Sequence, residues 1–254
     1  MRNTSSFMLL LIATLVILVA STALVSMRAQ NQKGLPRNDQ AQRKLDFENR
    51  FPIADYSAPE PADPQERAKR KSKDNRFPKG VLDELPNVTE SEIVDGHGLE
   101  RRPTLPVALS DMIIVGNVLN TQAYLSSNKT GLFSEFTISI EEVLKTTGSD
   151  PVLPGADILV EREGGRIRYP SGRVRWVRFA HEGMPSIGGR YVLFLRRTGP
   201  ENIPTILTGY ELRAGRVLPL DGVAEFEERK LPQFATYEGV EETAFLTTVR
   251  GLVK

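Results

Sequence analysis

The chain has 254 residues, enough for one or two domains, and a formal net charge of only +1. So small a charge gives no general attraction to nucleic acid or to anionic membranes, which argues against a nucleic-acid partner. The absence of cysteine excludes disulfides, a thiolate nucleophile and cysteine-ligated zinc.

The first predicted element is the apolar block Phe7–Val25, 19 residues without a charge behind the single basic residue Arg2. That length can cross a bilayer as a helix. Ser21–Ala23 supplies the small side chains of a signal-peptide cleavage site, so residues 1–29 are predicted to be either a signal peptide or a transmembrane anchor. If the anchor is not cleaved, the basic residues that follow it favour a cytoplasmic C-terminal part.

Residues 30–105 are predicted to form a disordered, charged, proline-containing linker. They carry 14 basic and 14 acidic residues and few large apolar ones, so they bury too little apolar surface to offset chain entropy. Within them, Arg67–Lys73 places five cations in seven residues. Flanking acids favour solvated linker charge there over a contact with anionic lipid or another polyanion.

From residue 106 the pattern changes to short strands, which predicts a β-barrel or sandwich over 106–254. Gly116 interrupts the β-rich run Asp111–Val118 and indicates a bulge or sharp bend. Further strands are predicted around residues 135–141, 157–161, 166–169, 173–176, 191–195, 205–212 and 216–220. The apolar spacing in Glu238–Val253 predicts an amphipathic terminal helix. We therefore expect an all-β fold closed by one helix.

Three stretches resemble a known group of folds: Ser110–Val118, Phe136–Lys145 and Gly188–Leu195. They are similar to strands of exported bacterial OB-like β-barrel domains related to netrin-like and metalloproteinase-inhibitor modules. The resemblance implies a small OB-like barrel and export to the cell envelope or beyond. Inhibition in the animal modules uses an N-terminal cysteine, which this chain lacks, so that activity is not implied.

Catalytic motifs are absent from the sequence. Its two histidines, His97 and His181, lack the companion ligands of a zinc site. Ser186 does not sit in a nucleophile elbow. Neighbouring acids such as Glu141 and Glu142 point to opposite faces of a strand, so they cannot flank one substrate bond. We expect no catalytic residue, no metal and no cofactor.

One constellation stands out, the predicted hairpin Gly164–Arg178. Its candidate binding residues are Arg166, Arg168, Arg173, Arg175, Arg178, Tyr169 and Trp176. Pairing of the two arms would bring the arginines onto one face, where guanidinium groups suit phosphate, sulfate or carboxylate. The alternative is a solvated hairpin face with both aromatic rings in the core.

These features predict a non-enzymatic interaction module that is exported, and either secreted or anchored in a membrane through Phe7–Val25. Its partner would be a protein or an anionic glycan bound by the arginine hairpin. Two alternatives stay open: a structural or assembly component of a cell-envelope complex, and an unrecognised hydrolase.

Overall fold

The computed structural model describes residues 49–86, 90–93, 102–147, 152–197, 202–222 and 231–253. All of them belong to one compact unit that begins at Phe47. The predicted membrane segment Phe7–Val25 and His97 lie outside the described residues. Among the helices that are described, none has the length and apolar character needed to span a bilayer.

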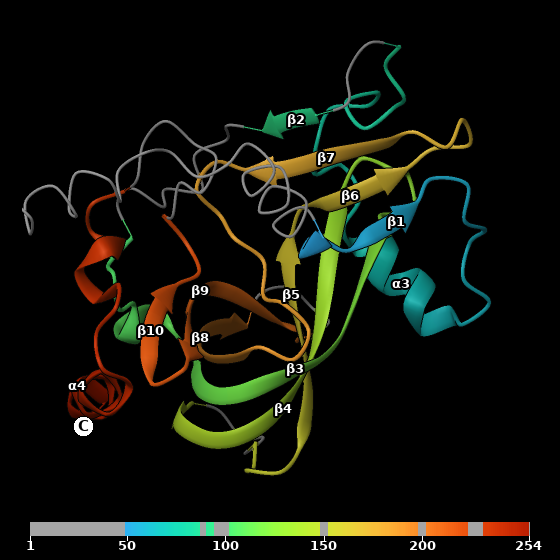
Figure 1. Ribbon diagram of the computed structural model, residues 1–254. Coiled ribbons are helices and arrows are strands. Elements are labelled where there is room, and N and C mark those ends of the chain that lie inside the picture. The colour runs from blue at the N-terminus through green and yellow to red at the C-terminus, as the bar shows by residue number, and fades with distance from the viewer. Residues whose placement is uncertain are drawn as a thin grey trace, which may run out of the picture. The chain divides into compact units, whose positions relative to one another are not determined.

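Five strands close into a barrel (Figure 1). They are β3 (Met112–Leu125), β4 (Leu132–Thr146), β5 (Asp157–Glu163), β8 (Arg190–Arg197) and β9 (Pro204–Arg213). The pairing order around the ring is β3-β4-β5-β9-β8 and back to β3, antiparallel throughout except for the parallel contact of β5 with β9. The predicted all-β barrel is confirmed.

The barrel interior follows from the two-residue alternation of its strands. Phe136, Ile138, Val160 and Leu193 point inward into one buried apolar cluster. The bulge predicted at Gly116 is also confirmed, because the pairing of β3 with β4 shifts register there. A Cβ at this position would lie 2.6 Å from a backbone oxygen of β4, so only glycine allows the two strands to approach this closely.

The outer surface of β3, β8 and β9 is covered by the terminal helix α4 (Glu242–Val253). Phe245, Leu246 and Val249 of α4 pack against apolar side chains such as Phe194 and Tyr210. The sequence predicts this helix from Glu238, but it begins at Glu242, because Glu241 forms an isolated β-bridge with Arg216. The short 3-10 helix η3 (Phe234–Tyr237) precedes it. Strand β10 (Arg216–Pro219) pairs with β9 in the predicted hairpin, and a second 3-10 helix, η2 (Val107–Leu109), precedes β3.

A second, smaller sheet has the strand order β1-β6-β7-β2. Its strands are β1 (Ile53–Asp55), β6 (Gly165–Arg168), β7 (Val174–Phe179) and β2 (Glu90–Ile93). The antiparallel pair β6–β7 is the predicted arginine hairpin. Helix α3 (Pro64–Ser72) lies beside this sheet, on the side of the molecule away from α4 (Figure 1).

The prediction of a disordered linker over residues 30–105 is wrong for residues 49–86, which are folded, and for Glu90–Ile93, which form β2. Phe51 is buried in the barrel cluster, while Ala54, Phe77 and Leu82 are buried against β6 and β7. Asp63 caps α3 by accepting a hydrogen bond from the Gln65 N–H at 3.0 Å. The average composition of the segment did not indicate this order. Its few apolar residues are far apart in the sequence but each packs in a core cluster, and several of its cations pair with acids of distant strands.

Candidate interaction surfaces

The hairpin of β6 and β7 does not gather its arginines on one face, and that part of the prediction is wrong. Residues paired across two strands share a face. Arg166 pairs with Trp176, whereas Arg175 pairs with Ile167, which lies on the other face. The alternation that suggested a single basic face therefore divides the basic residues between the two sides of the sheet.

Three of these arginines hold the folded segment 49–86. Arg166 Nε donates to the Phe51 carbonyl at 2.7 Å. Arg175 Nη1 donates to the carbonyls of Val81 and Asp83 at 2.8 and 3.1 Å. Arg173 instead forms an ion pair with the Glu84 carboxylate at 2.9 Å. Of the other two, Arg168 is exposed and Arg178 is half-buried beside a pocket described below.

The two aromatic candidates of the hairpin are buried, as the alternative interpretation expected. The Tyr169 hydroxyl donates to the Leu82 carbonyl at 2.9 Å. Trp176 stacks on Phe51, with 5.3 Å between ring centroids. Both rings therefore stabilise the docking of segment 49–86. Ligand binding by the hairpin stays a prediction.

A different surface of the barrel combines acids with aromatic rings. We call it the acidic–aromatic face, and it lies on the outside of β3, β4 and β5. Its residues form two rows across the three strands, Tyr124–Phe133–Glu163 and Gln122–Glu135–Glu161. The chain neighbours Phe136 and Val160 point into the barrel, so Glu135 and Glu161 point outward.

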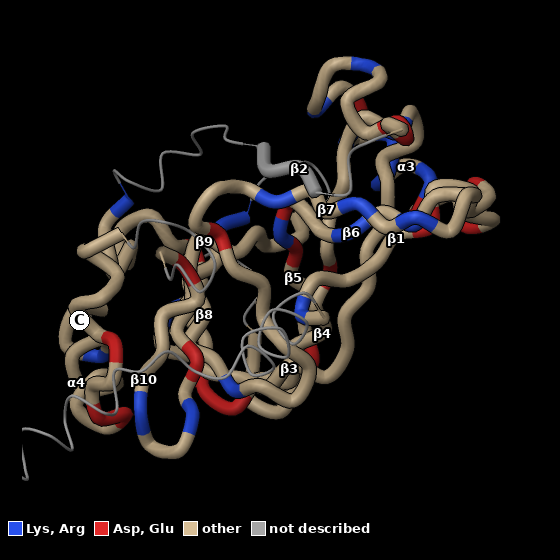
Figure 2. Tube along the Cα trace, turned by 45° about the horizontal axis from the view of Figure 1, so that its top comes forward, with Lys and Arg blue, Asp and Glu red and all other residues tan. Residues whose placement is uncertain are grey.

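Helix α3 and the residues after it lie on the acidic–aromatic face. Lys69 Nζ is 2.8 Å from a Glu135 carboxylate oxygen, Lys73 pairs with Glu161, and Arg76 pairs with Glu163. The four-residue spacing of Lys69 and Lys73 places both on one side of the helix, which ends at Ser72. Arg76 follows in a turn in which Asn75 has the left-handed φ of 63°. Figure 2 marks the basic positions of α3 and the acidic positions of the strands.

Aromatic rings lie beneath the same cations. Lys69 Nζ is 4.8 Å from the centroid of the Tyr124 ring, and Lys73 Nζ is 5.2 Å from that of Phe133. Each ammonium group therefore meets a carboxylate and the face of a ring together. Both interactions favour a cation, and both are strengthened where water is excluded.

The electrostatics of the face require a basic occupant. Glu135 and Glu161 are directly opposite on adjacent strands and only 1% and 3% exposed, an arrangement in which like charges repel. Burial raises the pKa of Glu161 above its ordinary value, more than the pairing with Lys73 lowers it. Burial lowers the pKa of Lys69, but its hydrogen bonds to Glu135 and Glu66 outweigh this and raise it overall. The cations of α3 thus compensate carboxylates that would otherwise destabilise the barrel.

A third charged group lies inside one end of the barrel. The buried Arg162 binds Asp221 through two nitrogens, both at 2.8 Å, and lies 3.4 Å from Glu182. Its Nη1 also donates to the Gly183 carbonyl at 2.6 Å. Asp221 in turn accepts the Gly183 N–H at 3.0 Å. The cluster therefore joins β5 to the loop after β7 and to the end of β10.

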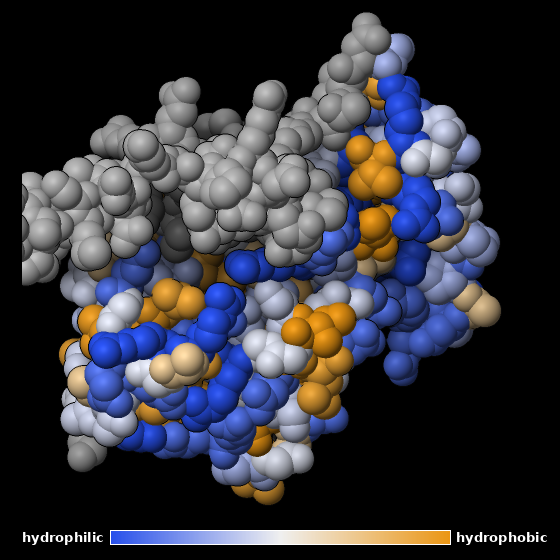
Figure 3. Space-filling view, viewed as in Figure 1, coloured by the Kyte–Doolittle hydropathy of each residue, from blue (hydrophilic) through white to orange (hydrophobic). Residues whose placement is uncertain are grey.

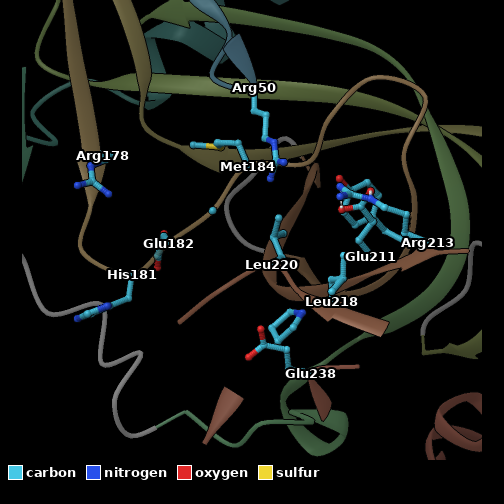
Figure 4. A pocket seen from close by; sticks show the side chains of 13 residues that line it. Arg50, Arg178, His181, Glu182, Met184, Glu211, Arg213, Leu218, Leu220 and Glu238 are labelled. Atoms are coloured by element: carbon cyan, nitrogen blue, oxygen red, sulfur yellow. Dashed lines mark hydrogen bonds and ion pairs between the residues drawn. The ribbon is translucent and has the colours of Figure 1, made fainter. Parts of the chain in front are cut away.

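Beside this cluster is a pocket of about 150 Å³ (Figure 4). Its lining mixes basic groups, including Arg50, Arg178 and His181, with the acids Glu182 and Glu211. This mixture of signs defines no ligand class. Within the described part of the chain, no three histidine or acidic side chains come together as a metal site would require.

The residues of the acidic–aromatic face and its basic occupants were not singled out from the sequence. Arg67–Lys73 was interpreted as solvated linker charge, which is wrong for Lys69 and Lys73 because both contact the barrel. The available signal was the four-residue spacing of these two lysines. The acids Glu135 and Glu161 at alternating positions of predicted strands are a matching signal.

No known protein family matches the sequence, and a search of curated proteins finds no match either.

Proposed function

We propose that this chain is a non-enzymatic interaction module that binds a basic helical segment of a partner protein on its acidic–aromatic face. The observation that carries the proposal is the docking of α3, in which Lys69, Lys73 and Arg76 meet Glu135, Glu161 and Glu163 in turn. A helix laid on a complementary surface is a common mode of peptide recognition.

The position of the face in the fold supports the proposal. OB-like barrels bind ligands on the surface around their second and third strands, which correspond here to β4 and β5. The visible face in Figure 3 is largely hydrophilic, with apolar side chains in small separate groups. The acidic–aromatic face beneath α3 offers carboxylates and aromatic rings, which suit recognition through charge.

The cell-envelope setting belongs to the same proposal. The uncharged block Phe7–Val25 would deliver or anchor the module, and the resemblance to exported OB-like domains favours an extracytoplasmic position. A basic segment of an envelope protein is then the partner, and this also accommodates an assembly role. An anionic glycan on the hairpin has less support, because Arg166, Arg173 and Arg175 are engaged with segment 49–86.

The test uses the full chain with Lys69→Gln and Lys73→Gln, which removes the two cations from the face. The probe is a fluorescent peptide with the sequence of residues 63–76, followed by anisotropy. We expect saturable binding whose affinity decreases as the salt concentration rises. Adding Glu135→Gln and Glu161→Gln should lower the affinity about ten-fold or more, since each substitution replaces a charge-assisted hydrogen bond by a neutral one.

A matched control changes Glu141→Gln and Glu142→Gln, acids of the same strand that pair elsewhere with Arg190 and Arg250. This control should bind the peptide unchanged. Absence of peptide binding to the Lys69→Gln/Lys73→Gln chain would contradict the proposal. An equal loss of affinity in the Glu135→Gln/Glu161→Gln variant and in the Glu141→Gln/Glu142→Gln control would contradict it as well. Tryptophan fluorescence verifies that each variant is folded.

A further inference from the structure

We infer that α3 is a displaceable strap: it occupies the acidic–aromatic face in cis, and a basic helix from a partner binds by displacing it. The inference rests on the proposed function, since it concerns the regulation of the same face. It follows from how α3 is held, how its ends are fixed, and what its removal exposes.

Polar contacts, not apolar burial, hold α3 on the barrel. Its nine residues, Pro64–Ser72, include no large apolar side chain, and Lys69 is its one buried residue. Most helices in proteins are stabilised by an apolar face, which α3 lacks. The contacts that hold α3 are charge pairs and cation–ring contacts, and a second basic helix can supply both kinds in its place. The helix can therefore leave the face without exposing an apolar surface of its own.

The segments on both sides of α3 are anchored independently of it. Phe51 and Ala54 are buried before the helix, and Phe77 and Leu82 are buried after it. The Phe77 N–H also donates to the Thr130 carbonyl at 2.8 Å. Residues between these anchors can open as one loop while the small sheet and the barrel stay folded, which is the usual form of local unfolding.

Opening would expose a surface that needs another cation. Glu135 and Glu161 would remain adjacent, with Tyr124 and Phe133 beside them. Water could solvate the carboxylates, but a second basic helix would restore both the charge pairs and the ring contacts. Because α3 is part of the same chain, its effective concentration at the face is of about millimolar order. A free peptide must compete with α3 at that concentration. The wild-type chain should bind the peptide about ten-fold or more weakly than the Lys69→Gln/Lys73→Gln chain.

Hydrogen exchange measured by mass spectrometry tests the displacement. The full chain is labelled with ¹⁵N, so that its fragments differ in mass from the added 63–76 peptide. At saturating peptide we expect faster exchange of the amides of residues 65–72. The amides of the anchors around Ala54 and Leu82, and those of β8, should not change. Rising salt without peptide should accelerate the same helix amides alone.

Two results would overturn the strap while leaving the proposed function intact. One is equal peptide affinity of the wild-type and Lys69→Gln/Lys73→Gln chains. The other is peptide binding to the wild-type chain with no change in the exchange of residues 65–72. By contrast, absence of binding to both chains would refute the proposed function itself. Continued protection of α3 in the Lys69→Gln/Lys73→Gln chain would refute the claim that its cations hold it in place.

Discussion

Replacing Lys69 by Met tests how strongly the acidic–aromatic face depends on its cation. Methionine keeps most of the aliphatic stem and removes the ammonium group, which lies 2.8 Å from the buried Glu135 carboxylate. Removing one partner of a buried ion pair costs roughly 3–5 kcal/mol, because the other charge stays buried and uncompensated. We expect a loss of about 3 kcal/mol, the lower end of that range, since Gln122 still donates to Glu135 at 2.8 Å. The loss cannot exceed the free energy that docks α3, because an undocked helix lets water reach the carboxylate.

Urea unfolding of the full chain measures this change through the single tryptophan, Trp176, which stacks on Phe51. The double variant Lys69→Met/Glu135→Leu serves as the control. With both charges gone it should recover most of the loss, because apolar replacements of a buried pair are often neutral. A loss below about 1 kcal/mol for Lys69→Met, with the α3 amides still protected, would refute the reasoning.

Three further predictions concern the barrel and the pH dependence of stability. Gly116→Ala should cost about 1–3 kcal/mol in urea unfolding, because its methyl group would lie 2.6 Å from a backbone oxygen of β4. Asp221→Asn should lower the free energy of unfolding by about 3–5 kcal/mol, because the guanidinium of Arg162 stays buried with a weaker partner. An unchanged melting temperature would contradict that assignment. The folded state raises the pKa of both Lys69 and Tyr124 above their ordinary values of 10.5 and 10.0. The unfolded chain therefore releases these protons first, so stability present below pH 10 should decline above it. Urea midpoints measured across this range should fall, and less steeply for Tyr124→Phe.

Local patterns predicted the barrel and its closing helix well. The alternation of apolar and polar residues around Phe136 and Ile138 indicates directly which side chains of the strand face the core. The uninterrupted apolar run of residues 191–195 predicts a strand that is buried on both faces. The bulge at Gly116 was readable for a similar reason, since glycine within a strand marks a close backbone approach. Such features depend on near neighbours in the chain.

The arginine hairpin shows where this reasoning failed. Its strands and turn were predicted, but the partners of Arg166, Arg173 and Arg175 lie about ninety residues or more away in the chain. The partners of Arg166 and Arg175 are backbone carbonyls, which no sequence pattern marks, and the acid that pairs with Arg173, Glu84, lies outside the hairpin. An acid-free basic stretch therefore suggested an external anionic ligand, whereas the fold supplies the acceptors itself.

By itself, the sequence determined the strand pattern of the barrel, the position of its bulge and the amphipathic helix that covers it. Only the tertiary structure decided the role of residues 49–86 and of the face they cover. The pairing of Lys69 with Glu135 joins positions 66 residues apart, and the local pattern around each residue does not say that the two meet. The physical reason is that the free energy of a charge depends on the solvent and the partners around it, and folding alone brings these together.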